Sequence, residues 1–396
     1  LQIGPAPEEE SDELWRAPTG WHSDAQPVVA RGLVYFGGYS LGERLPILVA
    51  VDAATGGVRW QTSAPVAWAE FPDAPALGGD ILFAPVQAPV AGVLAVVATS
   101  GEPLWFAPFG FTSVTAPAVD ADAVYVAGWG VRNPRDRAVN DASGAVFALD
   151  QRTGRERWRF LAGARFGAVS VGPETVYVPS DRGLFALDRA SGRKRWQARF
   201  SPGAGETATV AAGTIVFAGS EITSGKTGVF ALDAASGALR WRVDLPAAPG
   251  VRAGIAAAND HAYVSWWEAP PDDPGSGAPT LRAYELETGE EQWIFRVRDP
   301  EAPGLPIGAG TLTSPVVVGA SVLFGVAVRT PPPGAIGNAD GFYAVDNTSG
   351  ALRWRAAATT PIRSAPAVLD GVIYAMGGLR PRGGATGGNL FAFAAG

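Results

Sequence analysis

A single eleven-residue motif recurs seven times along this chain and constrains its fold more than any other feature. The motif reads Ala, an apolar residue, usually Asp, two variable residues, Ser or Thr, Gly, three variable residues and Trp. A period of about 40 to 50 residues is typical of repeat architectures, in which each unit buries its apolar face against the next. The seven copies end at Trp60, Trp105, Trp158, Trp196, Trp241, Trp293 and Trp354.

The length of 396 residues would ordinarily suggest two or three domains. The repeats continue to the C-terminus without a linker, so we expect one domain over residues 13–396. The acidic residues 1–12 before it are interpreted as a tether. Hydrophobic residues make up 47% of the chain, which is ample for a large core. The 51 glycines and 33 prolines fall between apolar runs, which indicates many tight turns.

Charge and cysteine content narrow the possible functions. The net charge is -7 and no run of Lys and Arg resembles a basic face, so we expect no nucleic-acid partner. The chain has no cysteine, which removes disulfides, thiolate nucleophiles and zinc knuckles. No run of 18 apolar residues is present to span a membrane. The chain begins at Leu1 without an initiator Met, so we expect a mature or trimmed form whose targeting or lipid-anchor signal is missing.

Each repeat is predicted to form four antiparallel strands. Residues 227–243 contain two short runs rich in branched and aromatic residues around a turn containing Gly237, which is typical of a hairpin. Two further apolar runs, at 207–210 and 214–218, precede this hairpin. Four such strands are the composition of a propeller blade. The prediction is therefore an all-β protein, a β-propeller of four-stranded antiparallel blades.

The ends of the chain set the blade count at eight. The C-terminus starts an eighth unit with strands at 364–369, 372–375 and 389–393 but lacks its last strand. The N-terminal segment Glu13-Leu14-Trp15-Arg16 matches the Trp-Arg ending of other copies. We therefore expect the last blade to be closed by N- and C-terminal strands, which removes an exposed sheet edge.

Prolines mark the first strand of five units. A proline cannot donate a hydrogen bond to a sheet, so the strands that begin there should lie at sheet edges, as the innermost strand of a propeller blade does. The five residues are Pro27, Pro75, Pro117, Pro315 and Pro366.

The motif resembles the tryptophan docking motif of PQQ-like propeller repeats. The resemblance implies that each Trp packs between neighbouring blades against the turn of the next motif. It covers nearly the whole chain, and only Val97 and Glu285 depart from it, in place of Asp. The residues expected to dock blades in this way are Trp15, Trp60, Trp105, Trp158, Trp196, Trp241, Trp293 and Trp354.

Variable loops on one end of the blades are the predicted binding surface. The excess length of the longer repeats falls mostly between second and third strands, and function concentrates in such loops on a rigid scaffold. Exposed aromatic residues are costly without a partner, although they could also plug the mouth of the propeller channel. The predicted protein-binding residues are Trp129, Arg132, Arg135, Arg137, Trp266 and Trp267.

No catalytic or metal site emerges from the residues. The segment Gly38-Tyr39-Ser40-Leu41-Gly42 matches a nucleophile elbow, but another strand follows it where a helix is needed. Only His22 and His261 are present, without ligand spacing. We therefore expect no catalytic residue, no metal and no cofactor.

Three functions remain open from the family resemblance. Quinoprotein dehydrogenases of eight blades hold PQQ against a disulfide of adjacent cysteines, which this chain cannot form. A ligand-sensing propeller of a receptor kinase, binding PQQ or another small molecule, is an alternative. The compact cysteine-free form is similar to the BamB family of envelope lipoproteins. This similarity implies a monomeric, non-catalytic scaffold that binds a BamA-like subunit and assists outer-membrane β-barrel assembly, located in the periplasm or at the outer membrane through a lipid anchor.

Overall fold

The computed structural model is built from β-strands arranged in eight sheets. No helix of the described residues is long and apolar enough to cross a membrane. The structure describes residues 13–18, 25–39, 46–64, 66, 70–87, 90–132, 139–201, 207–245, 253–268, 277–298, 309–330, 340–358, 362–377 and 388–394.

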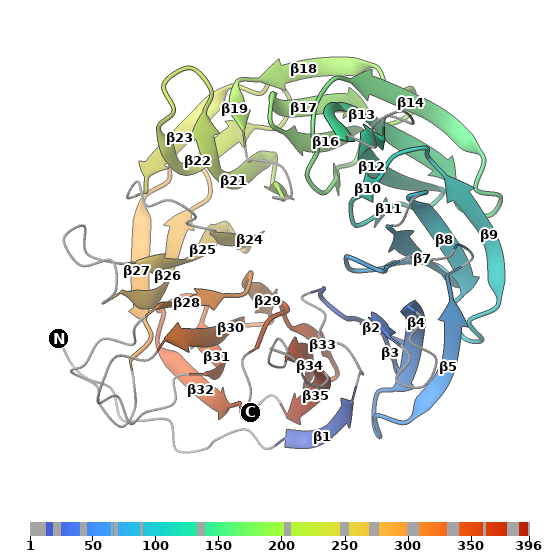
Figure 1. Ribbon diagram of the computed structural model, residues 1–396. Coiled ribbons are helices and arrows are strands. Elements are labelled where there is room, and N and C mark those ends of the chain that lie inside the picture. The colour runs from blue at the N-terminus through green and yellow to red at the C-terminus, as the bar shows by residue number, and fades with distance from the viewer. Residues whose placement is uncertain are drawn as a thin grey trace. The chain divides into compact units, whose positions relative to one another are not determined.

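Each sheet is one blade, in which strands that follow each other in the chain pair antiparallel (Figure 1). Blade 1 contains β2 (Val28–Ala30), β3 (Leu33–Tyr39), β4 (Pro46–Asp52) and β5 (Val58–Ser63). Blade 2 contains β6 (Ala76–Gly78), β7 (Ile81–Val86), β8 (Gly92–Val97) and β9 (Pro103–Pro108). Blade 3 contains β10 (Ser113–Val114), β11 (Ala118–Val119), β12 (Ala123–Arg132), β13 (Val139–Asp150) and β14 (Glu156–Ala162). Blade 4 contains β15 (Ser170–Val171), β16 (Thr175–Ser180), β17 (Gly183–Asp188) and β18 (Lys194–Ala198).

The remaining four blades repeat this pattern. Blade 5 contains β19 (Phe200–Ser201), β20 (Thr209–Ala211), β21 (Thr214–Glu221), β22 (Thr227–Asp233) and β23 (Leu239–Asp244). Blade 6 contains β24 (Gly254–Ala258), β25 (His261–Glu268), β26 (Ala278–Glu285) and β27 (Glu291–Arg296). Blade 7 contains β28 (Ala309–Leu312), β29 (Val316–Val318), β30 (Ser321–Thr330), β31 (Gly341–Asp346) and β32 (Leu352–Ala357). Blade 8 contains β33 (Ala367–Leu369), β34 (Val372–Gly377), β35 (Asn389–Ala394) and β1 (Glu13–Pro18).

Blade 8 joins the two ends of the chain. Its strand order is β1-β35-β34-β33, and Arg16 of β1 lies opposite Phe391 of β35. This confirms the predicted eight-bladed β-propeller and its closure by N- and C-terminal strands.

The prolines stand where the first strands begin or break. Pro27, Pro75 and Pro366 directly precede β2, β6 and β33, each of which is an edge strand of its sheet. Pro117 and Pro315 likewise directly precede β11 and β29, but in these blades an earlier short strand, β10 or β28, pairs with the same neighbour, so the sheets of blades 3 and 7 are five-stranded, as is that of blade 5. A proline has no N–H for the sheet, which fits its place directly before each of these strands.

The chain forms two compact units, Arg31–Leu245 and the combination of Leu1–Ala30 with Pro246–Gly396. The first unit holds β3 to β23, and the second holds β1, β2 and β24 to β35. The predicted tether, residues 1–12, lies outside the described residues. A single domain over 13–396 stays a prediction.

A tryptophan at the end of one blade docks onto the motif turn of the next. The indole Nε1 of Trp158 donates a hydrogen bond to the carbonyl of Arg189 at 2.9 Å, and Trp60 and Trp105 donate equivalently to Ala98 and Gln151. In the second unit, Trp293 donates to Asn347 at 3.2 Å. Each accepting residue directly follows the Asp position of its motif. The same carbonyl in blade 5, that of Ala234, accepts instead from the hydroxyl of Tyr177 in blade 4.

The motif glycine is required for two reasons. Gly192 has a φ of 69°, a left-handed conformation that side chains other than hydrogen rarely adopt. A Cβ at Gly192 would also lie 2.5 Å from Cε3 of Trp158, so the indole of the preceding blade occupies that space. The same ring contact occurs at Gly101, Gly154, Gly237 and Gly350.

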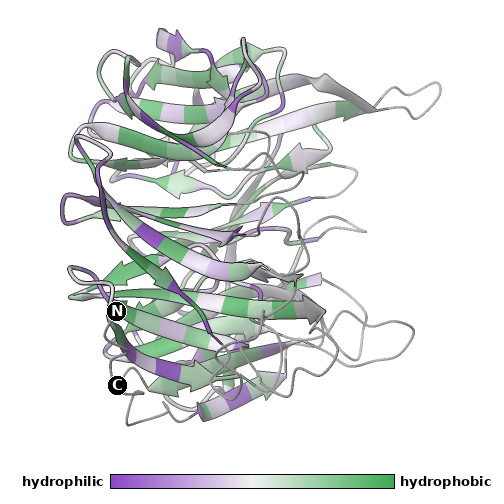
Figure 2. Ribbon diagram, turned by 90° about the vertical axis from the view of Figure 1, so that its left-hand side faces the viewer, coloured by the Kyte–Doolittle hydropathy of each residue, from purple (hydrophilic) through white to green (hydrophobic). Residues whose placement is uncertain are grey.

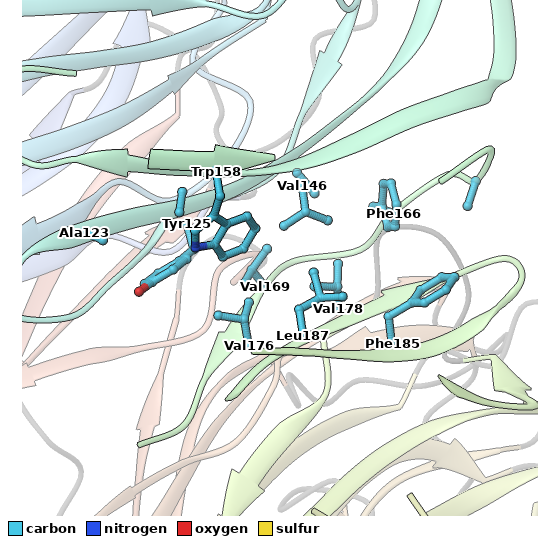
Figure 3. Close-up of a cluster of buried hydrophobic side chains, with 13 residues drawn as sticks. Ala123, Tyr125, Val146, Trp158, Phe166, Val169, Val176, Val178, Phe185 and Leu187 are labelled. Atoms are coloured by element: carbon cyan, nitrogen blue, oxygen red, sulfur yellow. The ribbon is translucent and has the colours of Figure 1, made fainter. Parts of the chain in front are cut away.

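The core between blades is apolar and closely packed. Figure 3 shows the ring of Trp158 of blade 3 beside Val169 and Val176, and Tyr125, Val178 and Leu187 belong to the same buried cluster. Hydrophobic residues follow the strands, whereas hydrophilic residues concentrate in the tight turns (Figure 2). The docking tryptophan therefore lies at the boundary between a dry core and a polar turn.

Paired charges close most of the motif turns. In blade 5, the carboxylate of Asp233 accepts from the Ser236 hydroxyl and pairs with Arg240 at 2.7 Å. The same pair is Asp150–Arg157 in blade 3 and Asp188–Arg195 in blade 4. Where Val97 replaces the Asp, Leu104 replaces the Arg, so the pair is lost as a unit.

The motif glycine has both a positive φ and an indole against its Cα, so replacing it should cost more stability than replacing a turn glycine that has the positive φ alone. Gly192→Ala should destabilise the protein by about 2–4 kcal/mol, because backbone strain adds to overpacking against Trp158. Gly213→Ala is the matched control, since Gly213 has a φ of 73° and nothing lies within 4 Å of its Cβ position. The control should cost about 1 kcal/mol. Equal losses in urea unfolding would show that the indole contact contributes nothing.

The motif ion pair predicts an acid-dependent stability. Hydrogen bonds from Arg240 and then Ser236 lower the pKa of Asp233 to about 2, whereas an unfolded Asp has a pKa of about 3.9. The stabilisation is therefore complete above about pH 4 and is lost as the pH falls toward about 2. The free energy of unfolding of the wild type should approach that of Asp233→Asn over this interval. A difference that stays constant across the interval would contradict the assignment.

Candidate protein-binding surfaces

The first candidate surface is the end of the β12–β13 hairpin in blade 3. Strands β12 and β13 pair beyond the length of the other blades, as far as Arg132 opposite Val139. A bulge follows Trp129, where Gly130 has a φ of 81°. This places the hairpin end opposite to the motif turn that joins β13 to β14, as antiparallel pairing requires.

The predicted residues of this hairpin lie in different environments. Trp129 is half-buried and packs against the core cluster that contains Trp158. Val131, two residues further, is 40% exposed. The backbone of Arg132 is the last paired position of β12, whereas Arg135 and Arg137 lie outside the described residues. The binding role of all four predicted residues stays a prediction.

The second candidate surface is the corresponding end of blade 6. Trp266 is only 3% exposed, and the guanidinium of Arg282 lies 5.1 Å from its ring centroid, in cation–π geometry. Trp267 is half-buried and packs against the cluster of buried residues that includes Phe324 and Val326. The ring of Trp266 is therefore buried beneath the surface and is not exposed for contact with a partner.

Ion pairs fix the position of Arg282. Its guanidinium pairs with Glu268 at 2.7 Å and with Glu291 at 2.5 Å, and Glu268 also pairs with Arg296 at 3.2 Å. Burial lowers the pKa of Arg282, but the carboxylates of Glu291 and Glu268 outweigh it and the pKa is raised. The network therefore holds a charged guanidinium over the ring of Trp266.

Two indole nitrogens at this end are buried without an acceptor. In the described part of the chain, the Nε1 atoms of Trp266 and Trp267 have no hydrogen-bond partner. A Cβ at Gly277 or Gly310 would lie within 2.6 Å of the Trp267 ring, so the glycines admit the indole. Unmet donors are uncommon in folded proteins, and the docking residue Trp196 has one as well, so these two donors do not by themselves indicate a ligand.

Trp129 and Trp267 occupy the same position in their blades. Tyr125 and Tyr263 pair with the motif residues Ala148 and Ala283, and each tryptophan follows four residues after its tyrosine. Both tryptophans are predicted binding residues, and their equivalence is visible in the sequence by counting from the motif Ala.

Arg282 is a site residue that the sequence analysis missed. The residue before the motif Ala is apolar in the other six copies and is Arg only here. That departure from the repeat was the available signal. Among the described residues, no group of His, Asp and Glu is arranged to hold a metal.

Comparison with known families decides the relationship. The sequence matches the model described as outer membrane protein assembly factor BamB over residues 46–208, 180–330 and 280–393. The chain belongs to this family. A comparison with curated proteins finds no match.

Solved structures share the BamB-family propeller at low sequence identity. BamB from Moraxella catarrhalis superimposes with a TM-score of 0.62 at 15% identity, covering 98% of each chain. Quinohemoprotein alcohol dehydrogenase from Comamonas testosteroni has a TM-score of 0.63 at 15% identity, covering 98% of this chain and 76% of its own. The computationally designed Ika8 protein has a TM-score of 0.64 at 12% identity, covering 96% and 100%. These structures share the fold alone.

The partly buried network around Arg282 predicts an effect of one substitution. Arg282→Ala should destabilise the protein by about 1–3 kcal/mol, because Glu291 loses this partner, Glu268 keeps only Arg296 and Trp266 is uncovered. Arg296→Ala is the matched control, since Arg296 reaches the same Glu268 with a side chain that is 48% exposed. The control should change stability by less than about 1 kcal/mol. Urea unfolding of both variants distinguishes a supporting network from a dispensable surface pair.

Proposed function

We propose that this BamB-family chain is a non-catalytic protein-binding scaffold of the bacterial cell envelope that assists outer-membrane β-barrel assembly. The observation that carries the proposal is the family match, whose description names an outer membrane protein assembly factor and whose segments together run from residue 46 to 393. The similarity to the Moraxella catarrhalis BamB over 98% of both chains supports it. The absence of cysteine separates this chain from the disulfide-bearing quinoprotein sites described above.

The partner in this proposal is a BamA-like assembly subunit, bound in the periplasm or at the outer membrane. The β12–β13 hairpin extends beyond the other blades and carries the exposed Val131. Its base is fixed by Trp129, which packs into the core. A rigid base with an exposed apolar residue is suited to contacts with another protein. The residues 1–12 would connect the propeller to an anchor in the envelope.

Site-specific photo-crosslinking tests this proposal. A photoreactive phenylalanine analogue at Val131 should form an adduct with a BamA-like subunit in cells of the native host. The matched control is the same analogue at Val58, which is 57% exposed and lies beside a motif turn. The control should give no such adduct. Mass spectrometry of the adducts identifies the partner.

Two outcomes would contradict the proposal. One is the recovery of intact, folded protein without a BamA-like adduct at Val131. The other is an equal yield of that adduct from both positions, since this would indicate proximity without a specific surface.

A further inference from the structure

The seven motif turns provide an internal comparison of what the fold requires. Each turn has four variable positions: the two before Ser or Thr and the two after Gly. In blade 5, these positions hold Ala234, Ala235, Ala238 and Leu239, and the turn forms with the same hydrogen bonds. Charge at these positions is therefore not needed to make the turn, so charged residues there require another explanation.

The turns of blades 3 and 4 concentrate positive charge at these positions. Blade 3 has Arg152 and Arg155, and blade 4 has Arg193 and Lys194 after its glycine. All four side chains are exposed. Among the described residues, none of the four pairs with a carboxylate. We call these two neighbouring turns, with their four cations, the basic turn pair.

The two turns adjoin each other. The carbonyl of Arg189, in the blade 4 turn, accepts from Trp158 at the end of the blade 3 turn. Gly192 packs on the same indole. The neighbouring Arg157 and Arg195 are already occupied by Asp150 and Asp188, and Arg189 pairs with Asp120 at 3.4 Å. Within the residues that the structure describes, the four cations of the basic turn pair have no carboxylate partner, and Lys194 alone donates to a side chain, the Gln197 amide oxygen at 3.5 Å.

The chemistry of this surface favours carboxylates as ligands. Three of the four residues are arginine, whose planar guanidinium binds carboxylates with two parallel hydrogen bonds. A protein of net charge -7 otherwise repels acidic partners, so a local positive surface directs where such a partner docks. Paired acids lie beside the cations, which disfavours a continuous polyanion such as nucleic acid.

The turn residues also argue against a membrane surface. The two turns expose Thr153, Ala190 and Ser191 beside the cations and no large apolar side chain that could enter a bilayer. Interfacial binding normally combines basic residues with Trp, Phe or Leu. The docking tryptophan Trp158 is buried beneath the turns and cannot supply this contact.

We infer that the basic turn pair, Arg152, Arg155, Arg193 and Lys194, is a docking surface for a carboxylate-rich segment of a partner protein. It lies at the opposite end of the blade 3 strands from the β12–β13 hairpin. It is therefore a second surface, independent of the proposed binding to a BamA-like subunit. A chain with both surfaces can hold two proteins at the same time.

A labelled hexaglutamate peptide tests the inference by fluorescence anisotropy at low salt. The wild-type protein should bind it, and a hexaglutamine peptide should not bind. A variant that carries the residues of the blade 5 turn at these positions should bind the peptide about tenfold or more weakly. Its substitutions are Arg152→Ala, Arg155→Ala, Arg193→Ala and Lys194→Leu. The blade 5 turn folds with these replacement residues, so the variant turns should fold as well, and urea unfolding checks this.

The control variant removes cations from the other end of blades 4 and 5. Arg182→Ala, Arg199→Ala and Lys226→Ala should leave the peptide affinity within about twofold, since these exposed residues lie away from the motif turns. An equal loss in both variants would reduce the effect to net charge and overturn the inference.

Two further results would also overturn it. One is binding to vesicles of anionic phospholipid without binding to the peptide, since this would make the surface a membrane contact. The other is self-association that depends on Glu287 and Glu290 of the blade 6 turn, since a second copy of the chain would then be the occupant. Crosslinking at Val131 is unaffected by either result, so failure here and failure of the BamA-like proposal are distinguishable.

Discussion

The contact between a docking tryptophan and the next motif turn is the interaction on which the propeller depends. One blade alone leaves an apolar sheet face exposed, and stacking against a neighbour buries it. In blades 3 and 4, Trp158 completes this burial and also donates a hydrogen bond to the carbonyl of Arg189. A single side chain therefore fills the apolar core between the blades and supplies the donor for a backbone carbonyl of the turn. The glycine beneath it is the necessary counterpart, because only Gly192 leaves space for the ring.

Repetition within one chain separates the requirements of the fold from those of function. The motif positions that contact the next blade are constant, and five of the seven motifs keep the Asp–Arg pair, whereas Val97 with Leu104 and Glu285 with Gln292 replace it. A residue that differs from the other copies of the repeat, at a position where the fold does not require the change, is therefore a candidate for function. Arg282 in place of an apolar residue and the cations of the basic turn pair are both departures of this kind. Each lies on a rigid element, which suits a binding surface.

The fold could be predicted from the sequence because its determinants are local and repeated. Motif spacing gave the blades, and the incomplete last unit required a strand from the N-terminus, which β1 supplies. The environment of Trp266 could not be predicted, because its burial depends on Arg282, which lies on the neighbouring strand. The basic turn pair was also missed. Its cations alternate with motif residues and come from two turns about one repeat apart, so no contiguous basic run appears in the sequence.

The pairing of β1 with β35 makes the order of synthesis matter. Glu13 lies opposite Phe393, so β1 cannot pair until β35, about 370 residues later in the chain, has been made. Contacts this distant in sequence form slowly, since the intervening chain must first be brought together. Blades 1 to 7 can each assemble from consecutive residues, whereas blade 8 cannot form until β33 to β35 have been synthesised. Strand β1 therefore has no partner in blade 8 before that point, and the closure of this blade follows the synthesis of β35.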